Sequence, residues 1–237
     1  MTRELILENV ARIRKELEEA SQGRYPAPRL IPVTKTRTAE EILVLKDAGV
    51  EEIGENRVQE IRSKTEDLGG AFRIHLIGRL QRNKVRQIIG DVCMIQSIDS
   101  LPLAEEISMR AVKAGIRMDV LTEISPAGEE QKGGVPMAET ERFLRQIAPL
   151  EGIRVKGLMA VMPLTEDQEY LDGLFAETRK LFERMRDTAV SGIEMTELSM
   201  GMSGDYQLAA RHGATMVRVG SAIFGPRPVR TEGEKAL

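Results

Sequence analysis

Apolar and polar positions divide the 237-residue chain into two alternating kinds of segment. Short apolar runs rich in valine, isoleucine and leucine are typical of buried strands. Between these runs, apolar residues recur at three-and-four spacing, which is typical of amphipathic helices. We expect strands at 29–34, 51–54, 72–77, 92–97, 117–124, 153–159, 196–199 and 215–219. We expect helices near 38–48, 56–67, 81–89, 100–114, 136–148, 167–189 and 203–212.

Local signals support several of these helices. Helix starts often carry a small polar residue followed by glutamate, or a proline in the first turn. Such signals occur at Thr38 with Glu41, at Ser100 with Pro102, and at Ser203 ahead of Asp205. They place helix starts shortly after several of the expected strands.

A further helix is expected before the first strand. Ile6, Val10, Ile13 and Leu17 recur at three-and-four spacing in a segment that is otherwise charged. Such a helix buries one face only, so it is expected to pack on the outside of the fold.

The count of β-α units predicts the fold class. Eight parallel strands in a chain of about 250 residues favour a single closed (β/α)8 barrel, with residues 1–237 as one domain. The alternative, an open doubly wound sheet, would carry a GxGxxG fingerprint, and the sequence has none. Pro32 is in tension with a closed barrel, because it cannot donate a hydrogen bond inside a strand.

Composition and charge narrow the classes of partner. The net charge is -3, and no basic cluster is interleaved with aromatic residues, so no nucleic-acid partner is expected. The N-terminal segment mixes acids and bases, and no apolar run has the length of a membrane span. We therefore expect a cytoplasmic protein without a membrane partner. The single cysteine, Cys93, is expected to be buried as a small hydrophobic residue.

Two glycine-rich loops predict an anion site. Gly201 and Ser203 lead into an expected helix, and Gly220 and Ser221 follow the last strand. Backbone N–H groups at such turns favour negative charge, and barrels commonly hold phosphate after their seventh and eighth strands.

Lys35 predicts covalent chemistry beside this anion site. Strand alternation sends Ile31, Val33 and Lys35 to the same side, so the lysine stem would rise from the barrel interior into its mouth. There, burial and a neighbouring cation such as Arg218 would depress the pKa of the amine and make it nucleophilic. An amine beside a phosphate cradle suggests a phosphorylated aldehyde, either pyridoxal phosphate or a sugar-phosphate substrate of an aldolase.

Seven motifs, in order over about 200 residues, resemble one family. They are "LIPVTKTRTAEEI", "IGENRVQE", "IHLIGRLQRNK", "IQSIDS", "GEEQKGG", "GLMAVMP" and "LSMGMSGDYQLAARHGATMVRVGSAIFGPR". The chain resembles the pyridoxal phosphate homeostasis proteins, single-barrel relatives of the N-terminal domain of alanine racemase. The resemblance implies that pyridoxal 5'-phosphate is the cofactor and that the fold is an alanine racemase-like barrel.

The resemblance also assigns roles to individual residues. It implies that Lys35 forms the Schiff base with the cofactor. It implies that Arg218 faces the pyridine nitrogen, where a cation disfavours transaminase chemistry. The remaining matched positions would cradle the phosphate (Gly201, Met202, Ser203, Gly220 and Ser221) or line the cofactor (Asn56 and Met159). Lys132 matches a loop lysine with a part in cofactor exchange.

The sequence departs from the family pattern at two positions. The family often has histidine where this chain has Arg79, and commonly a small aliphatic residue where it has Pro32. His75 and His212 lack a metal-ligand spacing, so no metal site is expected. We expect His75 to be a satisfied strand residue and His212 to lie at a helix end.

The resemblance leaves two function classes. A carrier would hold pyridoxal phosphate for vitamin B6 homeostasis and pass it to pyridoxal-phosphate-dependent apoenzymes; an enzyme would racemise amino acids. Racemases of this barrel type continue into a β-domain that supplies a second catalytic base, whereas this sequence ends about a dozen residues after "IFGPR". We therefore expect a monomeric carrier.

Overall fold

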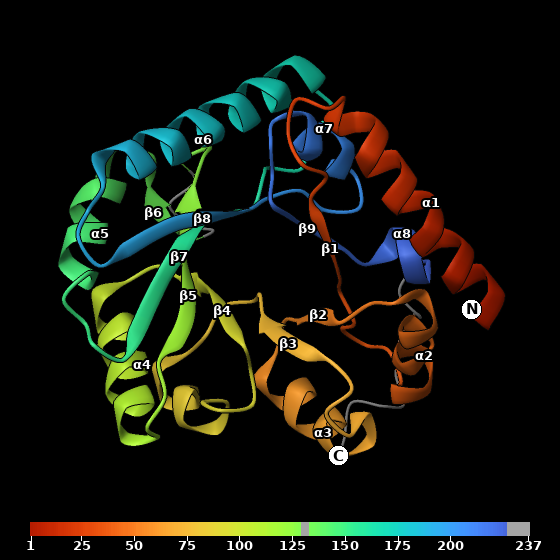
Figure 1. The fold of residues 1–237 in the computed structure, drawn as a ribbon, viewed down its shortest axis with the longest axis horizontal. Coiled ribbons are helices and arrows are strands. Elements are labelled where there is room, and N and C mark those ends of the chain that lie inside the picture. The colour runs from red at the N-terminus through yellow and green to blue at the C-terminus, as the bar shows by residue number, and fades with distance from the viewer. Residues whose placement is uncertain (129–132, 227–237) are drawn as a thin grey trace.

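Parallel strands close into a barrel, as the sequence predicts (Figure 1). The structure is a computed structural model that describes residues 1–128 and 133–226. In these residues, eight strands form the ring in the order β1-β9-β8-β7-β5-β4-β3-β2, and the two-residue β6 pairs with β5. The strands are β1 (Arg29–Pro32), β2 (Glu52–Glu55), β3 (Arg73–Leu76), β4 (Met94–Ile98), β5 (Met118–Ser125), β6 (Val135–Pro136), β7 (Ile153–Ala160), β8 (Ile193–Ser199) and β9 (Met216–Val219).

Helices surround the ring of strands (Figure 1). The α-helices are α1 (Arg3–Ser21), α2 (Ala39–Leu43), α3 (Val58–Leu68), α4 (Leu101–Lys113), α5 (Thr140–Ile147), α6 (Gln168–Thr188), α7 (Tyr206–Arg211) and α8 (Ser221–Phe224). Short 3-10 helices are η1 (Val44–Ala48), η2 (Arg82–Gln87) and η4 (Met137–Glu139). The helices predicted at 38–48 and 81–89 are therefore partly or wholly 3-10. The capping box of Thr38 and Glu41 is confirmed at the start of α2.

The predicted outer helix is also confirmed. α1 runs along the outside of the barrel against α7, α8 and η1 (Figure 1). Its buried face consists of Ile6, Val10, Ile13, Leu17 and Ser21. The three-and-four spacing thus set which side of the helix faces the barrel.

Pro32 is compatible with the closed barrel because of where its nitrogen points. Arg29 donates its N–H group to Thr215 just before β9 and Val33 donates to Val219 on β9, whereas Thr34 donates to the carbonyl of Gly54 on β2. N–H direction alternates along a strand, so the nitrogen of Pro32 faces β2. On that side the pairing is a single bridge between Val33 and Gly54, and it begins one residue after the proline. The missing donor therefore falls at the seam where the barrel closes.

Two apolar clusters fill the fold. The larger one lies between the strands and the helices. The smaller one draws all its members from strands around the ring, which places it inside the barrel: Ile31, Met94, Leu121, Met159 and Met216. Cys93 packs against this inner cluster but is only half-buried, so the expectation of full burial was too strong.

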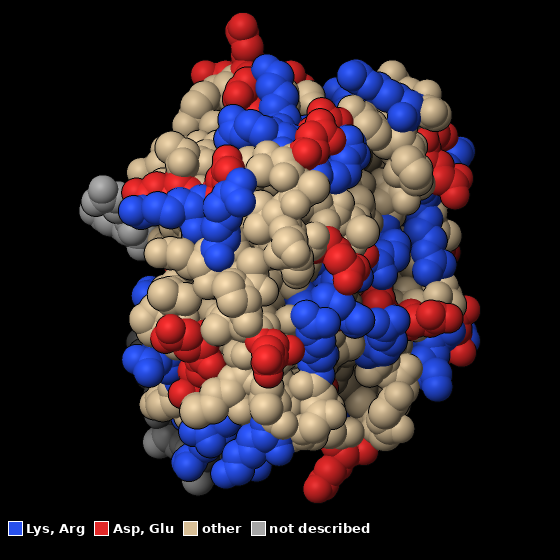
Figure 2. Space-filling view, turned by 60° about the vertical axis from the view of Figure 1, so that its left-hand side comes forward, with Lys and Arg blue, Asp and Glu red and all other residues tan. Residues whose placement is uncertain are grey.

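Charges of both signs are interspersed on the face that Figure 2 shows. Elsewhere in the described residues, ion pairs join side chains one helical turn apart, such as Arg145 with Glu141, or on neighbouring strands, such as Arg154 with Asp119. Among the helices of the described residues, none has the length and apolar character needed to cross a bilayer.

Candidate functional site

A cavity of about 530 Å³ opens at the C-terminal ends of the strands. Its volume lies in the range of small-molecule sites, roughly 300–1,000 Å³. It is lined by β9 and by the segments that follow β1, β2, β3, β7, β8 and β9. Most residues that the sequence singled out line it together: Lys35, Asn56, Met202, Ser203, Arg218, Gly220 and Ser221.

The loops after β8 and β9 meet at one hydroxyl. Ser203 Oγ accepts hydrogen bonds from the N–H groups of Gly220 at 3.1 Å and Ala222 at 3.2 Å. The prediction that Ser203 starts its own helix is wrong, because α7 begins at Tyr206 after Asp205. The serine instead joins the two loops. Because both N–H groups donate to Ser203 Oγ, the hydroxyl keeps its own proton to donate, and a hydroxyl among glycine-rich loops can bind a phosphate.

Gly201 shapes this cradle without lining the cavity. Its φ of +94° is one that side chains rarely adopt, and an added Cβ would come within 2.5 Å of the Ala209 Cβ. Its carbonyl accepts the N–H of Arg218 at 2.9 Å, which ties the loop after β8 to β9. Met159 also lies away from the cavity lining, inside the barrel.

Lys35 stands where strand alternation predicted. Ile31 belongs to the inner apolar cluster, and Val33 and Lys35 both line the cavity. The next residue, Thr36, has a φ of +64°, so the chain turns sharply after the lysine. The turn is pinned because the Thr36 N–H donates to Glu60 Oε2 on α3 at 2.7 Å.

A buried ionic cluster beneath Lys35 was not foreseen from the sequence. Glu55, 1% exposed, accepts hydrogen bonds at 2.7 Å from both Thr34 Oγ1 and Lys64 Nζ. Burial raises the pKa of Glu55, and the bonds to Lys64 and Thr34 oppose that rise. Lys64 also donates to the Thr34 carbonyl at 2.9 Å and lies 3.3 Å from Glu60. The only signal in the sequence is the four-residue spacing of Glu60 and Lys64.

Arg218 brings a buried positive charge to the cavity. It is 3% exposed, and it donates to Ser199 Oγ at 2.6 Å and to the Ala160 carbonyl at 2.8 Å. Burial lowers the pKa of Arg218 to about 10, although the charges of Glu123 and Asp205 raise it. The guanidinium therefore stays charged at neutral pH, in a fixed orientation.

Glu123, on β5, is an acid at this end of the barrel with a strongly perturbed pKa. Burial and the charge of Asp99 raise its pKa to about 7, against the opposing effects of Arg218 and Arg79. Arg79, one of the departures from the family pattern, thus takes part in the electrostatics of the mouth. Sequence reasoning missed Glu123 because a lone glutamate in a strand carries no motif.

Asn56 and Lys132 are the two remaining residues that the sequence predicted for the site. Asn56 has a buried side-chain oxygen without a hydrogen-bond partner in the structure. It lines both this cavity and a larger neighbouring groove that Arg79 also lines. Lys132 lies outside the described residues.

These features define a parallel (β/α)8 barrel protein whose mouth combines an amine, a buried guanidinium and an anion cradle. The model of the family "Alanine racemase, N-terminal domain" matches residues 6–228. The chain belongs to this family, and within it to the pyridoxal phosphate homeostasis proteins.

Curated relatives extend over nearly the whole chain. The pyridoxal phosphate homeostasis protein of Aquifex aeolicus is 39% identical over 217 residues, which is 91% of this chain and 94% of the relative. The protein of that name from Synechocystis is 35% identical and covers 85% of this chain and 93% of its own.

Solved structures agree with this assignment. PipY of Synechococcus elongatus, solved with pyridoxal phosphate bound, has a TM-score of 0.83 and 33% identity, covering 93% of this chain and all of its own. An alanine racemase from Clostridium difficile has a TM-score of 0.76 at 18% identity and covers 95% of this chain but 57% of its own. The racemase likeness is one of fold alone.

Proposed function

We propose that the chain binds pyridoxal 5'-phosphate as a Schiff base on Lys35 and serves intracellular vitamin B6 homeostasis. The observation that carries this proposal is the cavity that joins the Lys35 amine to the Ser203 cradle and to Arg218. The names of the relatives and the cofactor bound to PipY support it. When bound, the cofactor would supply an aldehyde for the amine and a phosphate for the cradle.

Each lining residue has a distinct part in this proposal. The Ser203 hydroxyl and the loop of Gly220 and Ser221 would hold the phosphate, while Gly201 and Met202 shape the loop that carries Ser203. Asn56 would offer its unpartnered amide oxygen to the ligand, and Met159 would support it from the barrel interior. Arg218 would face the ring nitrogen, where its positive charge disfavours protonation and weakens the ring as an electron sink.

Holding the cofactor fits the cavity better than racemisation does. Two-base racemisation needs a proton-transfer group on each face of the substrate carbon. Among the described residues that line the cavity, Lys35 is the only side chain suited to that task, since the other charged ones are Arg37 and Arg218. In the part of the chain that the structure describes, the mouth is open as well, because Leu164 is fully exposed and Met202 is 39% exposed.

We further propose that the carrier is a cytoplasmic monomer that passes its cofactor to pyridoxal-phosphate-dependent apoenzymes. The single cysteine excludes a disulfide within the chain and suits a reducing compartment. The exposed side chains of Leu164 and Met202 at the mouth would leave the phosphorylated aldehyde a route out of the cavity.

Two measurements test the proposed function. The purified chain is incubated with pyridoxal phosphate, desalted, and assayed for retained cofactor by absorption and by alkaline release; we expect close to stoichiometric retention, with a large loss in Lys35→Ala. Free D- and L-amino acids are then assayed for racemisation by the loaded protein, and no turnover beyond the free cofactor is expected. A chain that retains nothing contradicts cofactor binding, and robust turnover lost in Lys35→Ala contradicts the carrier role.

A further inference from the structure

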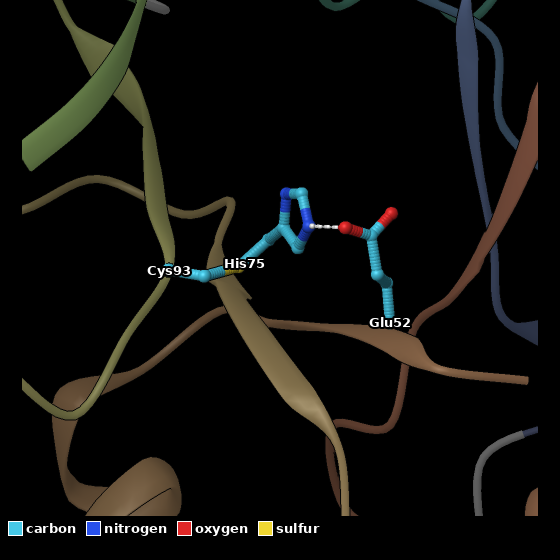
Figure 3. A group of neighbouring side chains, drawn as sticks. All are labelled: Glu52, His75 and Cys93. Carbon is cyan, nitrogen blue, oxygen red and sulfur yellow. Dashed lines mark ion pairs between the residues drawn. The ribbon is translucent and has the colours of Figure 1, made fainter. Parts of the chain in front are cut away.

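Three ligand-type side chains meet at the opposite end of the barrel from the cavity. Glu52 begins β2, His75 lies on β3, and Cys93 immediately precedes β4. Because β2, β3 and β4 are neighbours, one ligand atom from each residue lies within 4.8 Å of those of the other two. Figure 3 shows the His75 ring and the Glu52 carboxylate pointing toward one another.

The imidazole ring of His75 is buried and turned toward this group of side chains. The residue is 1% exposed, and its buried Nε2 atom makes no hydrogen bond but faces Glu52 Oε1 across 3.5 Å as an ion pair. The nitrogen points toward the Glu52 carboxylate (Figure 3), and the Cys93 thiol belongs to the same group of atoms within 4.8 Å. Carboxylate and thiolate are ligands that Zn²⁺ accepts together with imidazole.

We propose that Glu52, His75 and Cys93 form a binding site for a divalent metal ion of the zinc class. In a tetrahedral zinc site with bonds of about 2.0–2.3 Å, neighbouring ligand atoms are about 3.3–3.8 Å apart. The proposal requires the Glu52 and Cys93 side chains to rotate on binding, so that ligand atoms now within 4.8 Å reach that spacing. Three protein ligands leave one position for water, so the bound ion would be exchangeable.

Two arginines near Glu52 are compatible with a bound cation. Arg29 lies 3.0 Å from Oε2 and also pairs with Glu197, so it can remain on the oxygen that faces away from the metal. Arg73 lies 3.4 Å from Oε1, and its side chain is 65% exposed. Displacing it into solvent costs little, since exposed ion pairs contribute about 0–1 kcal/mol.

Gln96 can orient the histidine for metal binding. Its Nε2 lies 2.9 Å from His75 Nδ1, and its Oε1 accepts from the Ser199 hydroxyl at 2.7 Å. Binding of a metal at Nε2 leaves the proton on Nδ1. If the side-chain amide of Gln96 then rotates by half a turn, its oxygen accepts a hydrogen bond from His75 Nδ1. Its nitrogen then donates to Ser199 Oγ. Outer-shell partners of this kind fix the ring of a metal-bound histidine.

A cobalt titration of the full chain without pyridoxal phosphate tests the site. Cobalt bound to a thiolate gives a near-ultraviolet charge-transfer band, and Cys93 is the only cysteine, so the band reports this site alone. Burial works to lower the pKa of His75, but Cys93 and Glu52 raise it to about 9, so the metal must displace a proton and mildly alkaline buffer is used. We expect the band to saturate at one ion per chain and to be reversed by Zn²⁺.

Variants assign the ligands. Cys93→Ser should abolish the band, and His75→Gln should weaken cobalt binding by about tenfold or more. His212→Gln is the matched control, because His212 pairs with Asp172 on the surface, and it should bind as the parent does. Absence of the band at saturating cobalt would overturn the proposal. So would a cobalt affinity of His75→Gln and Glu52→Gln that equals the affinity of the parent.

A second readout needs no variant. Cys93 is half-buried and should react slowly with a thiol reagent. Zn²⁺ bound at this site should slow that reaction by about tenfold or more. An unchanged rate at saturating Zn²⁺ would also overturn the proposal, and neither readout depends on the cofactor.

Discussion

Arg218 donates from Nη1 to the hydroxyl of Ser199 across 2.6 Å, at the inner end of the cofactor cavity. Ser199 in turn donates to Gln96, whose amide nitrogen lies beside His75. A hydrogen-bonded chain therefore runs through the barrel interior from β3 to β9. It holds the guanidinium in place without an acid in direct contact.

Removing the central hydroxyl should destabilise the protein. In Ser199→Ala, buried groups of Arg218 and Gln96 lose a partner, and we expect the free energy of unfolding to fall by about 1–3 kcal/mol. Urea denaturation measures the change. Ser63→Ala is the control: its exposed hydroxyl bonds the Glu60 carbonyl, and its loss should cost under about 0.5 kcal/mol. If both substitutions lower the free energy of unfolding equally, the hydrogen-bonded series from Arg218 to His75 does not stabilise the barrel.

The ionic cluster under Lys35 yields a second prediction. Lys64→Met leaves the buried Glu55 carboxylate without its cation, and we expect a loss of about 3 kcal/mol in unfolding free energy. Adding Glu55→Gln should recover part of this loss, because the uncompensated charge is then gone. Lys180→Met removes an exposed pair with Glu177 and should change the free energy little. If the double variant is no more stable than Lys64→Met, the assigned cause is wrong.

Glu123 makes stability depend on pH. Its pKa is about 7 in the folded state against an ordinary value of 4.5, so between these values the folded state binds more protons than the unfolded state. The contribution of Glu123 to the free energy of unfolding is fully present below its ordinary pKa and is lost as pH rises through about 7. Relative to Glu123→Gln, the parent should lose about 3 kcal/mol of unfolding free energy across this window. Denaturation curves at several pH values measure the difference, and parallel profiles would contradict it.

Ser203→Ala tests the phosphate cradle. Loss of the hydroxyl should weaken pyridoxal phosphate binding by about tenfold, or about 1.4 kcal/mol. Pyridoxal has the same aldehyde but no phosphate, so its affinity should stay unchanged. Titrations of both ligands into parent and variant separate the two cases. An equal loss of affinity for both ligands would mean that the serine acts on the fold rather than on the phosphate.

The sequence predicted those features that depend on periodicity or on local motifs. Alternation along β1 placed Lys35 on the cavity side with Val33, and three-and-four spacing identified the buried face of α1. Eight short apolar runs predicted the ring of strands. The start of α7 was misplaced because a serine before a helix is the usual cap, whereas Ser203 bonds the neighbouring loop.

Features that depend on contacts between distant segments could not be read from the sequence. The pairing of Glu55 with Lys64 requires α3 to pack against the loop that carries Lys35. The grouping of Glu52, His75 and Cys93 requires three neighbouring strands in a particular register. Pro32 looked unfavourable in a closed barrel because the sequence does not show where the barrel closes. In the structure its nitrogen faces the β1–β2 side, where pairing is a single bridge.

The central claim is a covalent bond between Lys35 and pyridoxal phosphate, and reductive trapping tests it most directly. The loaded protein is treated with borohydride, digested, and mapped by mass spectrometry for the pyridoxyl-phosphate adduct. We expect the adduct on Lys35, with Lys64, which lies nearby but is bound to Glu55, left unmodified. An adduct found only on another lysine, or no adduct on a protein that has retained its cofactor, would contradict the claim.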